Sequence, residues 1–458
     1  MTYNALKPAF CAANKIITLG NENKSVTFGM VNTNDTVLKL RIKKAFRGFD
    51  CLFTGLTPEV FNMELSKLYS EDQIHTDVLK NENGVTSAQS IIDRIEDDAP
   101  IINLLNNIFQ EAILKRASDI HIETGNIGAE VLYRIDGILI KAKTISREKT
   151  NALSARIKIL ANLNVLENRQ PQDGHIEIKS EKFSLDVRVS IVPAIYGESI
   201  VLRLLNRSDI PFSLDSLGFS QKHSVCLKKL LAVTSGLILV TGPTGSGKTT
   251  TLAAILRELN DGKTKIISIE DPVEYRIKGI TQIQVNEDLK LTFNSLLRRI
   301  FRQDPDIIMI GEIRDTETAE LAVRAALTGH LVFATLHTNN AVEAVYRLQN
   351  LGISGYMIAA VLKMIIAQRL IRKICTGCGG CGCDKCSQTG FYARTVVAEF
   401  ITIEEEMQKL ISAGSTIDRL TEYLRETGHD NFFDDAKEKV KSGITTEQEM
   451  IRELGVKE

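Results

Sequence analysis

The stretch Gly242-Pro243-Thr244-Gly245-Ser246-Gly247-Lys248-Thr249 fits the phosphate-binding loop pattern G-x-x-x-x-G-K-[ST] at every fixed position. The apolar run 237–240 before it is typical of a buried strand, and the run 250–256 after it is typical of a helix. Glycines let such a loop turn its backbone N–H groups toward a phosphate, and the helix that follows adds partial positive charge. This context predicts a nucleotide-binding loop rather than a chance glycine-rich turn.

The chemistry of the loop predicts ATP with Mg²⁺ as its ligand. Lys248 carries an ammonium group that can reach the β- and γ-phosphates, and the Thr249 hydroxyl can ligate the metal ion. The expected nucleotide-binding residues are Gly242, Pro243, Thr244, Gly245, Ser246, Gly247, Lys248, Thr249 and Thr250.

The length of the chain indicates a protein of several domains. Its 458 residues are too many for a single hydrophobic core, since domains are usually about 100–200 residues long. Apolar residues make up 43% and the net charge is -1, so the overall balance does not call for nucleic acid or an anionic membrane. No run of 18 apolar residues occurs, and the first 20 residues lack a signal pattern, so we expect a cytoplasmic protein. The most apolar segment, 357–367, predicts a core helix.

Changes in pattern along the chain predict three parts. Residues 1–95 read as a small α/β module, with strands near 25–28 and 50–54, helices at 37–46 and 59–69, and a polar linker at 81–90. Residues 96–208 combine a helix with several strands, and a second linker follows at 206–217. Residues 218–458 alternate strand and helix patterns as in a parallel sheet flanked by helices, and become mostly helical after Cys386.

Acidic residues follow two expected strands of this third part, where parallel strands present their carboxyl ends to a nucleotide. The strand 266–269 runs into Glu270 and then Glu274, and either carboxylate could activate water; a solvated acidic turn is the alternative. The strand 306–310 ends near Glu312, which is placed to hold Mg²⁺. His337 lies at the end of a third strand. From the sequence, a structural role and a role as sensor of the γ-phosphate are equally favoured for it.

Five of the eight cysteines crowd between 375 and 386. They form two C-x-x-C pairs at metal-ligand spacing, with a fifth thiol, Cys381, in the short loop between the pairs. Three interpretations are possible: a tetrahedral zinc site, an iron–sulfur cluster, or free cysteines in a glycine-rich loop. Zinc is favoured over an iron–sulfur cluster because no redox motif accompanies the thiols. The expected ligands are Cys375, Cys378, Cys383 and Cys386.

Taken together, these motifs resemble the secretion ATPase superfamily, in particular the assembly motors of type IV pili and type II secretion. The resemblance covers nearly the whole chain from Asp97. It includes an acidic box at 270–274, a Walker B ending at 311–315 and a box with two histidines at 330–337. The segments 116–121, 170–174, 197–199 and 368–370 follow in family order.

The resemblance implies a fold class: α/β, with a PAS-like N-terminal domain at 96–208 followed by a RecA-like P-loop ATPase domain at 218–458. The ATPase domain would carry the tetracysteine loop at 375–386 and a helical C-terminal tail, and residues 1–95 would be a short partner-docking module. The implied assembly is a homo-hexamer at the inner membrane, bound to a membrane platform protein and to a cytoplasmic docking protein.

The resemblance also implies roles in catalysis. It favours Glu274 over Glu270 as the residue that activates water, and it makes Arg188 and Arg203 the arginines that reach the nucleotide from the PAS-like domain. Arg298 and Arg302 match a further arginine pair. Without the resemblance, Arg188 and Arg203 read as solvated strand residues paired with acids such as Asp186 and Glu198.

The leading hypothesis is therefore a motor that couples ATP hydrolysis to pilus assembly or protein secretion. One alternative is a nucleic-acid translocase on the same ATPase core, against which the near-neutral charge argues. Another is a scaffold that binds nucleotide without hydrolysing it, against which the intact Lys248, Glu274 and Glu312 argue.

Overall fold

The structure is a computed structural model, and it describes residues 11, 14–22, 25–33, 35–46, 50–57, 60–61, 99–179, 184–206, 213–287 and 289–455. The chain divides into two compact units, Met1–Pro100 and Ile101–Glu458. Within the ranges just given, every helix is too short or too polar to cross a membrane.

The first unit contains a small three-stranded sheet. Strand β1 (Ile16–Glu22) pairs antiparallel with β2 (Ser25–Met30), and β2 pairs parallel with β3 (Asp50–Gly55). The helix α2 (Thr36–Ala45) connects β2 to β3. The predicted strand–helix–strand order is therefore confirmed, although β1 escaped prediction. The predicted linker 81–90 lies outside the described residues, as does the predicted helix 59–69 apart from residues 60–61.

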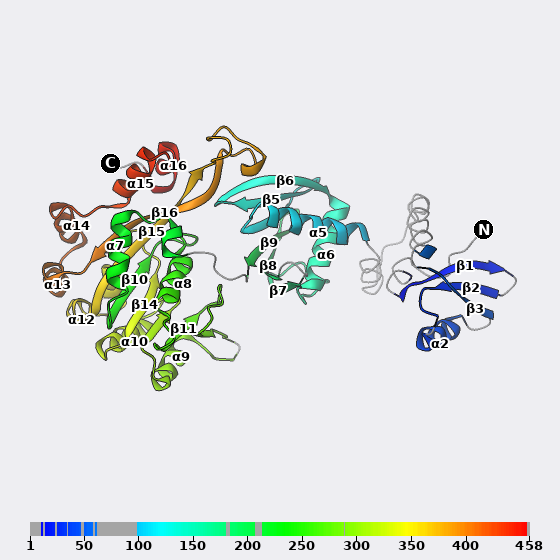
Figure 1. Ribbon diagram of the computed structural model, residues 1–458, viewed down its shortest axis with the longest axis horizontal. Helices are drawn as coiled ribbons and strands as arrows, with labels where there is room; N and C mark the ends of the chain where they lie inside the picture. The colour runs from blue at the N-terminus through cyan, green and yellow to red at the C-terminus, as the bar shows by residue number, and fades with distance from the viewer. Residues whose placement is uncertain are drawn as a thin grey trace. The chain divides into compact units, whose positions relative to one another are not determined.

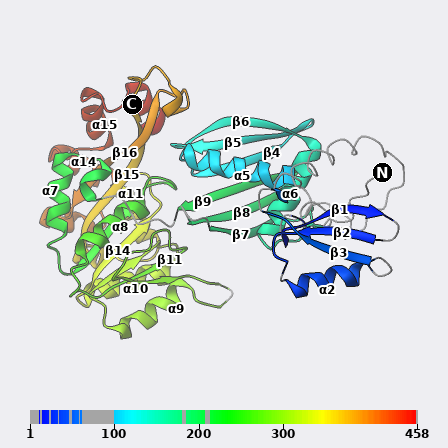
Figure 2. The ribbon, with the colours of Figure 1, turned by 45° about the vertical axis from the view of Figure 1, so that its right-hand side comes forward.

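The second unit begins with a six-stranded antiparallel sheet in the order β6-β5-β4-β9-β8-β7 (Figure 1). Alternate residues of its strands, such as Ile120, Val187 and Leu202, are buried against helices α5 and α6. Period-two alternation is what one covered face of a sheet requires. Figure 2 shows α5 running across this sheet. The elements are α5 (Ala99–Leu114), β4 (Asp119–Thr124), β5 (Gly128–Ile135), β6 (Ile138–Ser146), α6 (Arg147–Leu160), β7 (Gln172–Lys179), β8 (Ser184–Ala194) and β9 (Gly197–Asn206).

A seven-stranded sheet follows, in the order β12-β11-β13-β14-β10-β15-β16. All its neighbouring strands pair in parallel except the last pair, β15 and β16, which is antiparallel. The strands are β10 (Gly236–Thr241), β11 (Ile266–Glu270), β12 (Thr281–Gln284), β13 (Ile307–Ile310), β14 (Leu331–Leu336), β15 (Leu362–Ile374) and β16 (Phe391–Thr402).

Helices cover both faces of the seven-stranded sheet (Figure 1). Leu237 and Leu239 of β10 pack with helices such as α10 and α11, whereas Ile238 and Val240 pack with α7 and α8. Strands buried on both faces read as continuous apolar runs, which is why the central strands were predictable. The helices are α7 (Gln221–Leu230), α8 (Lys248–Leu259), α9 (Phe293–Ile300), α10 (Thr316–Leu327), α11 (Ala341–Asn350), α12 (Gly355–Val361), α13 (Glu405–Ser412), α14 (Ile417–Glu426), α15 (Phe432–Lys441) and α16 (Glu447–Leu454). Short 3₁₀ turns lie at Leu214–Leu217, Phe301–Gln303 and Asp384–Cys386.

One expectation was wrong in this region. The helix predicted over 357–367 is the end of α12 followed by the start of β15, because an apolar run buried on both faces has the same composition in a helix and in a central strand. The segment after Cys386 is mostly helical, as predicted, although β16 comes first and pairs along the length of β15. The helical tail begins only at α13.

Candidate functional site

The predicted phosphate loop joins β10 to α8, as the sequence indicated. Gly242, Gly245 and Gly247 have φ angles of 146°, 80° and 87°, a region that side chains disfavour. A Cβ atom at Gly242 would also collide with the carbonyl oxygen of Gln368 on β15. The loop conformation therefore requires these glycines.

Two contacts hold the loop against neighbouring strands. The hydroxyl oxygens of Thr241 and Thr338 lie 2.5 Å apart, and the Thr338 N–H donates to the Thr241 oxygen at 3.1 Å. On the other side, the Gln368 amide donates to the carbonyl of Ser246 at 2.7 Å. The start and the middle of the loop are thus tied to the segment after β14 and to β15.

Lys248, the first residue of α8, is 8% exposed. Its Nζ donates to the carbonyls of Gly242 at 2.8 Å and Pro243 at 3.1 Å. Burial lowers the pKa of this lysine to about 8, although the nearby carboxylates Glu312 and Glu274 act in the opposite direction. A buried cation with acceptors only from the loop backbone suits an incoming anion such as a phosphate.

The structure brings Glu312 and His337 to the same edge of the sheet. Glu312 follows β13 and His337 follows β14, and the His337 Nε2 lies 3.5 Å from a Glu312 carboxylate oxygen. Arg314 forms an ion pair with the other carboxylate oxygen. Burial lowers the pKa of His337, which keeps its imidazole neutral at pH 7. A neutral imidazole and a carboxylate beside Lys248 form a polar site at the carboxyl ends of parallel strands.

The two acids of the 270–274 box lie in different environments. Glu270 is 5% exposed and accepts hydrogen bonds from the Ser268 hydroxyl at 2.6 Å and the Gln282 amide at 3.0 Å. Burial raises the pKa of Glu270 despite these bonds. Glu274 is exposed and near enough to Lys248 to act on its pKa. Glu274 is therefore accessible to water, whereas Glu270 is buried and held by two hydrogen bonds.

Arg188 and Arg203 lie on β8 and β9 of the six-stranded sheet, directly opposite each other. In the described residues no hydrogen bond or ion pair joins either of them to the phosphate loop. The expected pairing with Glu198 is not found for Arg203, which binds Asp119 at 3.0 Å, while Glu198 binds Lys158 at 2.6 Å. Of the further pair, Arg298 forms an ion pair with Glu317.

The four predicted cysteine ligands converge between β15 and β16. Their sulfur atoms all lie within 4.8 Å of one another, and three of the separations are 3.9, 3.8 and 3.7 Å. Backbone N–H groups of Gly382 and Cys383 donate to two of the sulfurs, each at 3.2 Å. Cys381 is exposed and lies outside the group.

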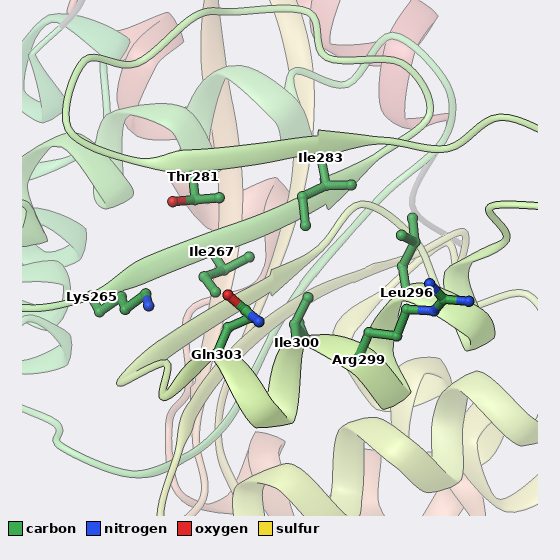
Figure 3. Close-up of a pocket in the computed structure, with 8 residues that line it drawn as sticks. All are labelled: Lys265, Ile267, Thr281, Ile283, Leu296, Arg299, Ile300 and Gln303. Carbon is green, nitrogen blue, oxygen red and sulfur yellow. The ribbon is translucent and has the colours of Figure 1, made fainter.

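A cavity of about 290 Å³ lies away from these residues, between strands β11 and β12 and helix α9 (Figure 3). Its floor is aliphatic, and Lys265, Arg299 and Gln303 supply polar groups at its edge. None of its lining residues belongs to the phosphate loop or to the strand ends that carry Glu312 and His337. The nucleotide site is therefore defined by the loop, not by this cavity.

The sequence profile of the family described as "Type II/IV secretion system protein" matches residues 94–452. The chain belongs to this family. It is 44% identical over 365 residues to "Type II secretion system protein HxcR" of Pseudomonas aeruginosa, which covers 78% of each chain. It is 39% identical over 433 residues to "Type II secretion system ATPase E" of Vibrio cholerae, covering 87% of this chain and 86% of the relative. Among solved structures, the pilus retraction motor PilT with bound ADP matches with a TM-score of 0.55 and 31% identity, over 75% of this chain and 95% of that one.

Membership of the type II/IV secretion family confirms the α/β P-loop fold and the motor ATPase class predicted from the motifs. Use of a nucleotide with Mg²⁺ follows from that class. The predicted roles of individual site residues stay predictions, as do the boundaries between the second and third domains.

Sequence reasoning missed the supporting residues of this secretion ATPase site. Thr241 and Thr338 carry no motif signal, because a threonine at a strand end is common. Gln368 lies in the family segment 368–370, whose sequence does not indicate a role, and the structure shows that it supports the phosphate loop. Arg369 next to it donates to the carbonyl of Asn339 at 2.9 Å, in the loop that also carries His337.

Proposed function

We propose that this protein is a ring-forming ATPase, a homo-hexamer that couples ATP hydrolysis to type II protein secretion or type IV pilus assembly. It would act on the cytoplasmic side of the inner membrane through a platform protein in the membrane and a cytoplasmic docking protein. The proposed parts are a docking module at 1–95, a PAS-like domain at 96–208 and a RecA-like ATPase domain at 218–458. Secretion and pilus motors among the relatives support this proposal.

One observation supports hydrolysis above all. Lys248, Glu312 and His337 come from three separate segments and converge at one edge of the parallel sheet, and the Glu312–His337 distance is 3.5 Å. A site that only bound nucleotide would need the loop and the lysine, whereas an acid held in place by an imidazole and a guanidinium serves the metal ion of phosphoryl transfer.

Each residue then has a proposed role. The loop 242–250 binds the phosphates, with Thr249 and Glu312 holding Mg²⁺, whose charge offsets that of the phosphate oxygens. His337 donates to the γ-phosphate, and Glu274 orients the attacking water. Arg188 and Arg203 reach the nucleotide from the PAS-like domain and offset charge that develops on the γ-phosphate.

We also propose that Cys375, Cys378, Cys383 and Cys386 bind one structural zinc ion. A tetrahedron of sulfur atoms at a Zn–S distance of ~2.3 Å has edges of roughly 3.8 Å. Sulfur separations of 3.7–3.9 Å fit that tetrahedron, and the two N–H···S hydrogen bonds suit thiolate ligands. Four protein ligands leave no open position, so the metal would stabilise the loop rather than take part in hydrolysis.

The test of the proposed function separates the two acids of the 270–274 box. Glu274→Gln should bind ATP with wild-type affinity and lower kcat about 10²–10⁴-fold, because only the activation of water is lost. Glu270→Gln should instead leave kcat and ATP affinity close to the wild-type values, because the amide oxygen of glutamine can accept the bonds from Ser268 and Gln282 that one oxygen of Glu270 accepts.

The matched control is Glu258→Gln, an exposed acid on α8, which should change neither quantity. Phosphate release and equilibrium ATP binding are measured on the purified full-length proteins. If Glu274→Gln hydrolyses at the wild-type rate, the proposed base is wrong. ATP-loaded Glu274→Gln should also sediment as a hexamer, and a monomer at full ATP occupancy would contradict the proposed ring.

A further inference from the structure

Five polar residues form one line across the six-stranded sheet. The strand register places Arg134 and Arg203 on either side of Asp119, Arg188 beyond Arg203, and His175 beyond Arg188. Residues directly opposite in antiparallel strands point to the same face of a sheet. We call this line, Arg134-Asp119-Arg203-Arg188-His175, the cross-strand row.

The cross-strand row faces away from the helices that cover this sheet. The residues next to its members along the strands, such as Ile120, Val189 and Leu202, belong to the core under α5 and α6. Successive side chains of a strand point to opposite faces, so the row lies on the face opposite that core. Three guanidinium groups share this line with a single carboxylate, that of Asp119.

Asp119 is nearly buried, at 6% exposure, and its two oxygens have different partners. One accepts a hydrogen bond from Arg203 Nε at 3.0 Å. The other accepts from the Ser118 hydroxyl at 2.8 Å and lies 3.8 Å from Arg134 Nε. The carboxylate is therefore held from two sides and grips Arg203 through the inner nitrogen of its guanidinium.

This mode of contact leaves the outer end of Arg203 available. The side chain is 55% exposed, and within the described residues its two terminal nitrogens make no hydrogen bond. Arg188, directly opposite, makes no hydrogen bond or ion pair in the same part of the chain. Two neighbouring guanidinium groups repel each other, and an arginine side chain carries about 2 kcal/mol of rotamer entropy, so an isolated pair would spread apart in water.

We propose that Asp119 is the positioning residue of Arg203. It fixes the side chain by Nε and offsets the repulsion from Arg188, so that the terminal nitrogens of both arginines point together toward an anionic group, the nucleotide phosphates. This inference rests on the proposed function, in which Arg203 acts on the nucleotide. Asp119 itself touches no substrate in this scheme.

The competing explanation is that Asp119 only stabilises the sheet by neutralising Arg134 and Arg203. That role predicts a loss of folding stability with no specific change in kcat. Positioning instead predicts a lower kcat at an unchanged ATP affinity, and an effect that depends on the presence of Arg203. The two explanations differ in the measured quantities, so kinetics and stability are followed in parallel.

The first experiment uses Asp119→Asn, which keeps the size of the side chain and removes its charge. The full-length protein is assayed at a concentration at which ring assembly is complete, and kcat should then fall about 10- to 100-fold. A small displacement of a catalytic group can lower the reaction rate about 10²-fold. KM for ATP should stay within about twofold. Glu123→Gln, an exposed acid on the same strand and face, is the matched control and should be kinetically silent.

A double-mutant cycle decides whether Asp119 acts through Arg203. In the Arg203→Ala background, Asp119→Asn should cause no further loss of kcat. An additive loss, or a kcat for Asp119→Asn equal to that of wild type while Arg203→Ala is impaired, would overturn the inference and leave the proposed function intact. Normal hydrolysis by both Arg203→Ala and Arg188→Ala would instead show that the proposed role of the arginines is wrong.

A second pair of variants covers the case in which Asp119→Asn fails to fold. Arg203→Lys keeps the positive charge but lacks the Nε atom that Asp119 binds, whereas Arg188→Lys loses no such contact. Positioning predicts that Arg203→Lys lowers kcat at least about tenfold more than Arg188→Lys. Equal effects of the two lysine variants would contradict it.

Discussion

The buried ammonium group of Lys248 makes a quantitative prediction about pH. Its pKa is lowered from 10.5 to about 8, first by burial and further by Arg369, while Glu312 and Glu274 partly compensate. Since one pKa unit corresponds to about 1.4 kcal/mol, keeping this cation charged in the empty site costs about 3 kcal/mol. Triphosphate binding replaces the missing solvation, so the bound lysine should stay charged at pH values where the free one does not.

ATP affinity should therefore fall as pH rises through the pKa of the free site. With a pKa of about 8, the lysine is about nine-tenths charged at pH 7 and about one-tenth charged at pH 9. The dissociation constant should rise about tenfold between these two pH values, or about 1.4 kcal/mol. His337 does not contribute to this change, because its pKa is lowered and its imidazole is neutral throughout.

The assay is equilibrium binding of a fluorescent, non-hydrolysable ATP analogue with Mg²⁺ to the wild-type protein, at pH 7, 8 and 9 and constant ionic strength. Lys248→Arg is the control, since a guanidinium stays protonated over the whole range. Its affinity at pH 7 should be lower, because the arginine does not fit the same site, but it should not change with pH. A wild-type affinity that varies less than twofold, or an arginine variant with the same slope, would refute this reasoning.

Two further predictions concern the frame of the site. Burial raises the pKa of Glu399 on β16 to about 7. Between about pH 4.5 and 7 the Glu399 carboxyl group is therefore ionised in the unfolded protein and protonated in the folded protein. The free energy of unfolding should fall by up to about 3 kcal/mol over this range, and Glu399→Gln should remove the slope and be the more stable protein at pH 8, as measured by urea unfolding. Purified protein should carry one zinc per chain by metal analysis, retained in Cys381→Ser and lost in Cys386→Ser; iron in its place, or zinc loss on Cys381→Ser, would contradict the assignment.

The local features of the site were predictable because their signal is contiguous. The phosphate loop specifies its own glycines, lysine and helix start within eight residues. Glu312 and His337 were predictable in a weaker sense, since parallel strands align their carboxyl ends and bring residues that follow them together. The different surroundings of Glu270 and Glu274 could not be read from the sequence, because the hydrogen bond that Glu270 accepts from Gln282 depends on the pairing of neighbouring strands.

The cross-strand row shows the limit of such reasoning. Asp119 and Arg203 are separated by 84 positions, and their contact exists only because β4 pairs with β9 in one register. A shift by one residue would send either side chain to the opposite face. Nearer acids in the sequence, Asp186 and Glu198, were the natural partners to expect, yet Arg203 pairs with Asp119 and Glu198 with the buried Lys158.

Strand β15 explains why loss of the metal should stay local. Gln368 in this strand supports the phosphate loop, and Cys375 follows the strand directly, about 23 Å further on at the usual rise per residue. Between them Arg372 is held by Glu449 of α16, which accepts its backbone N–H at 3.1 Å and its guanidinium at 2.9 and 2.6 Å. Although burial opposes ionisation, bonds from Arg452 and Arg372 lower the pKa of Glu449 to about 2, so this clamp stays charged at every pH of interest. Chelation should therefore loosen the cysteine loop up to Arg372 and leave ATP affinity within about twofold of the metal-loaded protein, because a change at the loop must first break this buried pair.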